Sequence, residues 1–196
     1  MDSIVKNLIY ERKILSIGET IINLSLISVN YDFENYYLET TNRRYSLKIN
    51  KKNVDQCSVI NRMYNDIKFN PLTSREIYYS DPEILLMEYF QAGSPDIRFL
   101  NQHIFGESIA KFHTKRESYY GYGYDTYIGS LLQENKMSQS WKKFYLNQRF
   151  DCLLSKMKET LSINSELNDK ILIVRDYIDR NLSEPSQSTL IHGDIW

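Results

Sequence analysis

Residues 20–90 contain five short segments that are typical of β-strands and one segment that is typical of a helix. In the third β-type segment, Tyr45, Leu47 and Ile49 alternate with Ser46 and Lys48, which is the period of two expected for a strand with one buried face. The helix is expected to begin at an Asn53 N-cap. Polar turns join the segments, which favours an antiparallel sheet carrying one helix. The β-type segments cover residues 20–29, 36–40, 45–49, 76–80 and 84–88, and a polar turn is expected over 30–35.

The pattern changes to helices after Gly93. Ser94 and Pro95 supply an N-cap and a first-turn proline. Apolar residues at helical spacing predict further helices over 141–157 and 167–182, followed by a strand over 189–192. The chain therefore reads as an α+β protein of two lobes. The sheet lobe covers residues 1–90, beginning with a helix over 3–15, and an incomplete helical lobe covers 91–196.

Composition excludes several classes of partner. The 196 residues carry a formal net charge of −1, so no basic field attracts nucleic acid or anionic lipid. No segment has the length of a membrane span, and the N-terminus has no signal-peptide pattern. Cys57 and Cys152 lack metal-type or redox spacing, so reduced thiols and a cytoplasmic location are expected.

Lys48 is the first candidate for chemistry. A lysine that alternates with apolar residues is usually the exposed side of an edge strand, and taken alone this interpretation is the simpler one. Its place on the third strand, directly before the helix, also fits a cation that reaches nucleotide phosphates from a rigid support.

Residues 85–90 end the last strand of the sheet lobe. They fit an ordinary buried strand with a polar end. They fit equally well a hinge whose backbone amide and carbonyl groups bind an adenine edge.

Residues 190–196 bring a carboxylate, Asp194, out of a strand through a glycine turn. In phosphoryl transfer, an aspartate in such a loop accepts the proton of the attacking hydroxyl. A lone His-Gly-Asp tripeptide is a weak signal. Its position behind a sheet lobe and a helical lobe favours the catalytic interpretation.

These stretches resemble the fructosamine (ketosamine) kinases, within the wider group of aminoglycoside phosphotransferases and choline kinases. The stretch most specific to the fructosamine branch is 127–135, followed by Trp141, Phe144, Tyr145 and Arg149. The other matching stretches are 45–50, 86–90, 105–113 and 191–196.

The resemblance implies a protein-kinase-like fold and ATP-dependent phosphorylation of a sugar hydroxyl on a glycated amine, with ATP and Mg²⁺ as cofactors. It implies a small-molecule acceptor, with no nucleic acid and no membrane as partner. By residue, it implies phosphate binding by Lys48, adenine binding by Glu88, Tyr89 and Phe90, loop support by His192 and Gly193, base catalysis by Asp194, and an acceptor-side place for Trp196.

Three features depart from the family pattern. Residues 29–34 contain no glycine, although family members place glycines there. Gln56, beside Asp55, stands where a glutamate partner of Lys48 is expected. The asparagine and second aspartate that hold magnesium in the family are not in this sequence, so we expect no metal ligands here and weak or no activity from this chain alone.

Two alternatives stay open. The chain could be a non-catalytic remnant or split-gene fragment, which binds ligand without chemistry or needs a second chain to supply the rest of the helical lobe. The acceptor could instead be an aminoglycoside or choline, although the 127–135 stretch favours the fructosamine branch.

Overall fold

The computed structural model describes residues 2–52, 54–69, 75–90 and 102–191. Internal contacts divide the chain into two compact units, residues 1–108 and 109–196. The lobe boundary expected at residue 90 stays a prediction, because residues 91–101 lie outside the described ranges. In the part of the chain that the structure describes, no helix is both long and apolar enough to cross a membrane.

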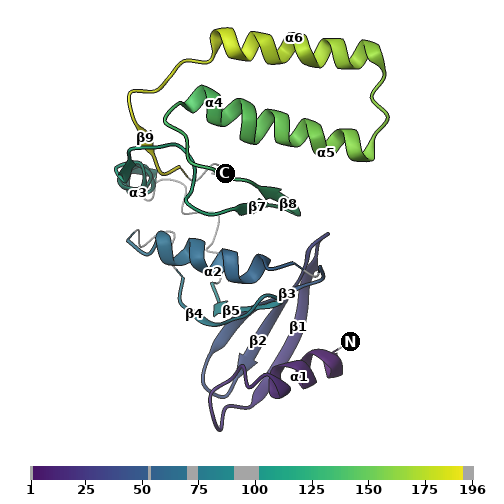
Figure 1. Ribbon diagram of the computed structural model, residues 1–196. Coiled ribbons are helices and arrows are strands. Elements are labelled where there is room, and N and C mark those ends of the chain that lie inside the picture. Colours follow the sequence, from purple (N-terminus) through teal and green to yellow (C-terminus); the bar gives the residue numbers. More distant parts are fainter. Residues whose placement is uncertain (1, 53, 70–74, 91–101, 192–196) are drawn as a thin grey trace. The chain divides into compact units, whose positions relative to one another are not determined.

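The first unit is built on a five-stranded antiparallel sheet with the order β1-β2-β3-β5-β4 (Figure 1). This confirms the antiparallel sheet expected from the alternating pattern. Its second strand begins at Phe33, earlier than expected, because the preceding turn is tight: the Asn30 N–H donates to the Phe33 carbonyl at 2.9 Å. The strands are β1 (Ile21–Val29), β2 (Phe33–Thr40), β3 (Arg44–Asn50), β4 (Ile77–Ser80) and β5 (Ile84–Glu88).

Helix α1 (Asp2–Glu11) covers one face of this sheet. It contributes Val5 and Ile9 to the main apolar core, where Leu38 and Leu47 are fully buried. Removing such side chains from water supplies most of the stability of the unit. The sheet residues that share this core are Leu24, Tyr36, Leu38, Tyr45, Leu47, Ile49, Ile84 and Leu86.

Helix α2 (Gln56–Asp66) packs on the opposite face through a smaller cluster. Asp55 is its N-cap, because the carboxylate accepts the Ser58 N–H at 3.3 Å. The helix therefore begins later than expected, and the predicted cap Asn53 lies outside the described residues. The cluster joins Phe33, Cys57, Leu85 and Met87, with Ile60, Tyr64 and Ile77 at its edge.

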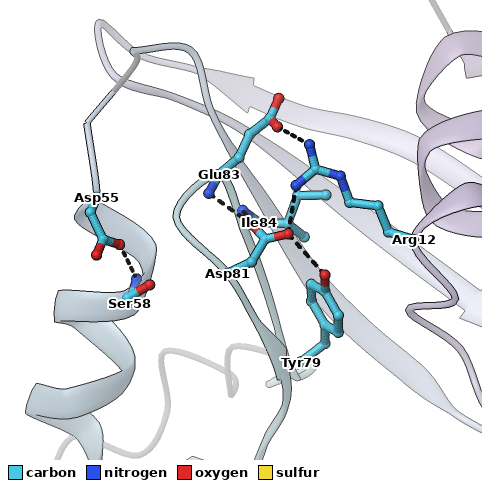
Figure 2. A network of polar contacts seen from close by, with 7 residues as sticks. All are labelled: Arg12, Asp55, Ser58, Tyr79, Asp81, Glu83 and Ile84. Carbon is cyan, nitrogen blue, oxygen red and sulfur yellow. Dashed lines mark hydrogen bonds and ion pairs between the residues drawn. The ribbon is translucent and has the colours of Figure 1, made fainter.

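An ion-pair network ties the end of α1 to the β4–β5 turn (Figure 2). Arg12 donates to Asp81 at 2.5 Å and to Glu83 through its other terminal nitrogen. The Tyr79 hydroxyl donates to Asp81 at 2.8 Å. Burial tends to raise the pKa of Asp81, but the Arg12 hydrogen bond and the other donors outweigh it and lower that pKa. The network adds a polar anchor to α1, whose apolar face is already in the core.

Glu19 is a buried carboxylate, at 5% exposure. It accepts hydrogen bonds from the Tyr45 hydroxyl at 2.8 Å, from the Ser16 N–H at 3.2 Å and from the Thr40 hydroxyl. Burial alone would raise the pKa of Glu19, but these donors together lower it. The ionised form therefore stabilises the fold above the pKa of the unfolded chain, and this contribution is lost as the pH falls through the folded pKa.

We expect Glu19→Gln to lower the free energy of unfolding by about 1–2 kcal/mol at pH 7, because one acceptor loses its charge. Chemical denaturation between pH 3 and pH 7 measures the free energy of unfolding of both proteins. The difference between wild type and Glu19→Gln should shrink below about pH 4.3, the ordinary pKa of a Glu side chain. The exposed Glu11→Gln is the matched control. Parallel wild-type and Glu19→Gln profiles would contradict the assignment.

The second unit begins with the end of α3 (Gln102–Phe112) and is mostly helical. A π-helical turn, Leu146–Asp151, interrupts the helix expected over 141–157. Cys152, which follows it, is only partly buried, whereas Cys57 is fully buried. The other elements are β6 (Arg116–Glu117) paired with β9 (Ser188–Thr189), the hairpin β7 (Thr126–Ile128) and β8 (Leu131–Gln133), α4 (Trp141–Tyr145), α5 (Cys152–Thr160) and α6 (Ser165–Asn181).

Candidate functional site

The register of the sheet brings Lys48 onto the α2-side face. Lys48 pairs with Asn35 on β2 and with Leu85 on β5. Directly paired residues point to the same side of a sheet, so Lys48 shares a face with Leu85, which packs against α2. The expectation that Lys48 lies opposite Tyr45 and Leu47 is confirmed.

Lys48 is held in an environment that desolvates its charge. Burial lowers the pKa of its ammonium group, Cys57 acts in the opposite direction, and Arg75 lowers it further. The Lys48 Nζ lies 5.6 Å from the centroid of the Phe33 ring. Among the residues that the structure describes, no ion pair joins Lys48 to a carboxylate. A partly buried cation without a carboxylate is well suited to an anionic ligand.

Neither expected partner forms an ion pair with Lys48. The Asp55 carboxylate caps α2, and Gln56 is buried at 1% exposure. The α2 residue that interacts electrostatically with Lys48 is Cys57, whose thiol has its pKa raised to about 12, chiefly by burial. A neutral thiol cannot supply the charge that a glutamate would, so Cys57 does not offset the positive charge of Lys48.

The next row of the same face is formed by Tyr37, Ser46 and Met87, which pair across β2, β3 and β5. The Tyr37 ring meets the Tyr89 ring edge-on, with centroids 4.8 Å apart. The row leads from Lys48 toward the residues after β5. Tyr37 and Ser46 are half-buried and supply an aromatic ring and a small hydroxyl side chain, which suit a flat aromatic ligand, whereas Met87 is buried at 2% exposure in the cluster against α2.

The predicted hinge residues lie at this end of the sheet. The Glu88 N–H already donates to the Glu76 carbonyl at 2.8 Å, so this amide is not available to an adenine edge. Phe90 is 68% exposed, and the Arg75 guanidinium lies 5.4 Å from its ring centroid. The hinge interpretation therefore depends on the backbone groups of Tyr89 and Phe90 and on the Glu88 carbonyl.

The β1–β2 turn occupies the position where the family pattern has glycines. Asn30 organises it: its side-chain oxygen accepts the Asp32 N–H at 3.0 Å and the Phe33 N–H at 2.7 Å. This is an Asx turn, and it uses the amides that a glycine-rich loop would offer to phosphates. The absence of glycine is evident from the sequence, whereas this role of Asn30 was missed there.

In the second unit, the stretch 127–135 forms the β7–β8 hairpin with Gly129 at φ +54° in its two-residue turn. Asn135, 4% exposed, follows the hairpin and donates to the Tyr124 carbonyl at 2.9 Å and to the Thr126 hydroxyl at 3.0 Å. Its side-chain oxygen accepts from Arg149 at 2.5 Å. Asn135 and Arg149, which both belong to the part of the sequence most specific to the fructosamine branch, are thus joined in one hydrogen-bonded cluster.

Arg149 projects from the π-helical turn and lies 4.7 Å from the Phe144 ring centroid. It also donates to the Glu134 carbonyl at 2.8 Å. Trp141 stacks on Phe144 with centroids 5.9 Å apart. Single π-helical turns within an α-helix, such as the one that carries Arg149, often occur at functional sites. Glu184, missed in the sequence, accepts the Trp141 N–H at 2.7 Å and so fixes the start of α4.

The chain enters the predicted catalytic loop from β9, where the Leu190 N–H donates to the Lys115 carbonyl at 3.0 Å. His192, Gly193, Asp194 and Trp196 themselves lie outside the described residues, so their roles stay predictions. The described ranges also contain no group of three or more side chains that could hold a metal ion.

Comparison with known proteins identifies the relationship. A family model described as fructosamine kinase matches residues 9–196. The chain belongs to the fructosamine kinase family. The match covers the sheet, the β7–β8 hairpin and the predicted catalytic loop, so it agrees with the resemblance found in the sequence.

Curated relatives and solved structures agree with this family. A probable ketoamine kinase of Enterococcus faecium is 28% identical over 170 residues, which are 83% of this chain and 59% of the relative. One from Vibrio parahaemolyticus is 33% identical over 97 residues, 49% of this chain and 33% of the relative. A crystal structure named as a fructosamine-3-kinase of Thermobifida fusca matches with a TM-score of 0.72 at 19% identity, over 91% of this chain and 64% of that chain.

These structural matches confirm the protein-kinase-like α+β fold for this member of the fructosamine kinase family. A second crystal structure, named as a fructosamine-3-kinase of Haemophilus somnus, has a TM-score of 0.65 at 22% identity, over 85% of this chain and 58% of that chain. The chain thus spans about three fifths of the E. faecium relative and of both solved structures.

Proposed function

We propose that this chain contributes the nucleotide-binding sheet and the catalytic-loop motif of an ATP-dependent kinase that phosphorylates a sugar hydroxyl of ketosamines. The observation that carries the proposal is Lys48: a desolvated cation on β3 that has no carboxylate ion pair in the described ranges. Family membership supplies the reaction class.

In this proposal the sheet positions the nucleotide. Lys48 binds phosphate oxygens, and Tyr37 and Ser46, which pair across β2 and β3, support the base on the way to the hinge. Tyr89 and Phe90 offer their backbone groups to the adenine edge, while the Glu88 N–H already donates to the Glu76 carbonyl. Fixed positioning of this kind is the main contribution of a protein to phosphoryl transfer.

Asp194 is the proposed base that accepts the proton of the attacking hydroxyl, with His192 and Gly193 shaping the loop and Trp196 on the acceptor side. Magnesium, when bound with ATP, would neutralise charge on the phosphates. The described residues offer Lys48 for the phosphates and no cluster of three metal ligands, so no step is assigned to the metal.

A second candidate is nucleotide binding without transfer. The observation that favours it is the Asx turn at Asn30, which uses the amides of Asp32 and Phe33. A site that has lost its amide cradle can still bind nucleotide through Lys48. Phosphoryl transfer would suffer more, because charge on the moving phosphoryl group is less well stabilised.

The test has two stages on the full chain. Titration calorimetry should detect binding of ATP with magnesium; the absence of binding at millimolar ATP would overturn the proposal. A coupled assay with fructosyl-lysine, kanamycin or choline as acceptor then separates the candidates. Turnover on fructosyl-lysine that is lost in Asp194→Asn supports the kinase, and binding without any turnover supports the second candidate.

A further inference from the structure

Two lysines flank the β1–β2 turn, one at each end. Lys48 lies over the ring of Phe33, where β2 begins. Lys52 lies over the ring of Tyr31, at the tip of the turn, with its Nζ 3.8 Å from the ring centroid. Lys48 lies on β3 and Lys52 lies in the segment between β3 and α2. The end of β3 therefore places one lysine on each side of the turn.

The backbone fixes the place of Lys52. Asn50, 4% exposed, accepts the Lys52 N–H at 2.8 Å and donates to the Val54 carbonyl at 2.7 Å. The Lys51 N–H donates to the Asp32 carbonyl at 2.7 Å, which joins this segment to the turn. The position of Lys52 relative to the turn is therefore built into the fold.

The negatively charged Asp32 in the β1–β2 turn disfavours the approach of a phosphate group unless a second cation lies nearby. Asp32 is 6% exposed, and its Oδ1 has no hydrogen-bond partner in the part of the chain described. A buried carboxylate repels phosphate, and the Asx turn at Asn30 has used the neighbouring amides. Lys52 makes no ion pair with a carboxylate in the described ranges, so its charge is available.

The ring contact does not hold Lys52 firmly. A cation over an exposed tyrosine ring gains little, whereas a charge-assisted hydrogen bond to phosphate is among the stronger polar contacts. On its other side, Lys52 borders a hollow that is also lined by Asp55 and Glu83. Lys51 lines the hollow as well, so its two carboxylates balance two lysines and the hollow has no net positive charge to attract an anion, which leaves the side facing the turn.

We propose that Lys52 is a second phosphate-binding residue of the site, taking over from the turn amides that Asn30 occupies. It moves from the Tyr31 ring to the terminal phosphates of a nucleoside triphosphate. This inference rests on the proposed nucleotide site. It assigns Lys52 to the phosphates alone, because the contacts to the base lie at the other end of the sheet.

Titration calorimetry on the full chain with ATP, adenosine and inorganic tripolyphosphate tests this. Lys52→Ala should weaken ATP and tripolyphosphate binding about tenfold and leave adenosine unchanged, since a charge-assisted contact is lost. Lys52→Arg should retain most of the affinity. Lys51→Ala, an exposed neighbour of equal charge, is the control and should change ATP binding less than about twofold at physiological salt.

Equal effects of Lys51→Ala and Lys52→Ala, or an equal loss for ATP and adenosine, would overturn the inference. Wild-type binding of ATP with no change in Lys52→Ala would overturn it while leaving the proposed nucleotide site intact. If the wild type bound none of ATP, adenosine and tripolyphosphate, both the role of Lys52 and the proposed nucleotide site would be wrong. Thermal unfolding of each variant without ligand shows whether a loss of affinity reflects a loss of fold.

Discussion

Lys48→Met is expected to weaken ATP binding about 100-fold while making the free protein more stable, since a charge-assisted phosphate contact is worth about 1.5–3 kcal/mol. The loss follows because Lys48 is the cation that the sheet register directs to the proposed phosphate site. The gain follows because the ammonium is desolvated and has no carboxylate ion pair in the described part of the chain. Opposite changes in affinity and stability would identify Lys48 as a binding residue, since a structural lysine would lose both.

The stability gain should be about 1 kcal/mol, at the lower end of what replacing a buried charge by an apolar side chain has given elsewhere. It should also depend on pH. Burial lowers the pKa of Lys48, so the wild type carries a penalty for the charged form below the folded pKa and regains stability as the pH rises from the folded to the unfolded pKa. Lys48→Met lacks this rise. Chemical denaturation at pH 7 and pH 10 measures it.

Arg44→Met is the matched control for Lys48→Met. Arg44 belongs to the same strand and also carries a positive charge, but it is exposed and pairs with Glu39 at 3.4 Å. Its replacement should change ATP affinity and stability only slightly. If Arg44→Met weakened ATP binding as much as Lys48→Met, general electrostatics would explain the result and the site assignment would fail.

Alternation along single strands made the sheet predictable. Tyr45, Leu47 and Ile49 each lie buried because a strand with a period of two must bury one side of its pleat. The same alternation predicts that Lys48 lies on the other face of the strand. These inferences are local, and the physics that decides them acts within a few residues.

Contacts between distant residues could not be predicted. Arg149 reaches Asn135 fourteen positions away, and the Trp141 amide is fixed by Glu184, forty-three positions further on. Helix and strand periodicities predict only neighbours close in sequence, so they do not indicate such pairs. Helical periodicity also over-predicted burial in α6, where Leu167 and Val174, two residues of the expected apolar face, are 44% and 49% exposed. The Asx turn at Asn30 could have been predicted, because asparagine favours such turns. From the sequence, only the lack of glycine in the β1–β2 turn was noted.

Arg149→Met is expected to lower the stability of the second unit by about 1–3 kcal/mol, the cost of leaving buried acceptors without their donor. Arg149 donates to Asn135 and to the carbonyl groups of Glu134 and Gln148. With the guanidinium gone, the buried Asn135 oxygen and the Glu134 carbonyl lose a donor each. The methionine side chain preserves the contact with Phe144 but cannot donate.

Urea denaturation followed by tryptophan fluorescence measures this loss, because Trp141 stacks on Phe144, the ring that Arg149 contacts. Arg149→Lys should recover less than half of the stability, since an ammonium group cannot reproduce the planar geometry that reaches two carbonyl groups and an amide at once. Arg180→Met removes an exposed arginine paired with Asp176 and should cost only about 0.3–0.5 kcal/mol. Equal losses in Arg149→Met and Arg180→Met would show that the Asn135–Arg149 cluster does not hold the hairpin. A large loss confined to Arg149 would explain why the residues specific to the fructosamine branch occur together: the hairpin keeps its place only when Asn135 and Arg149 are both present.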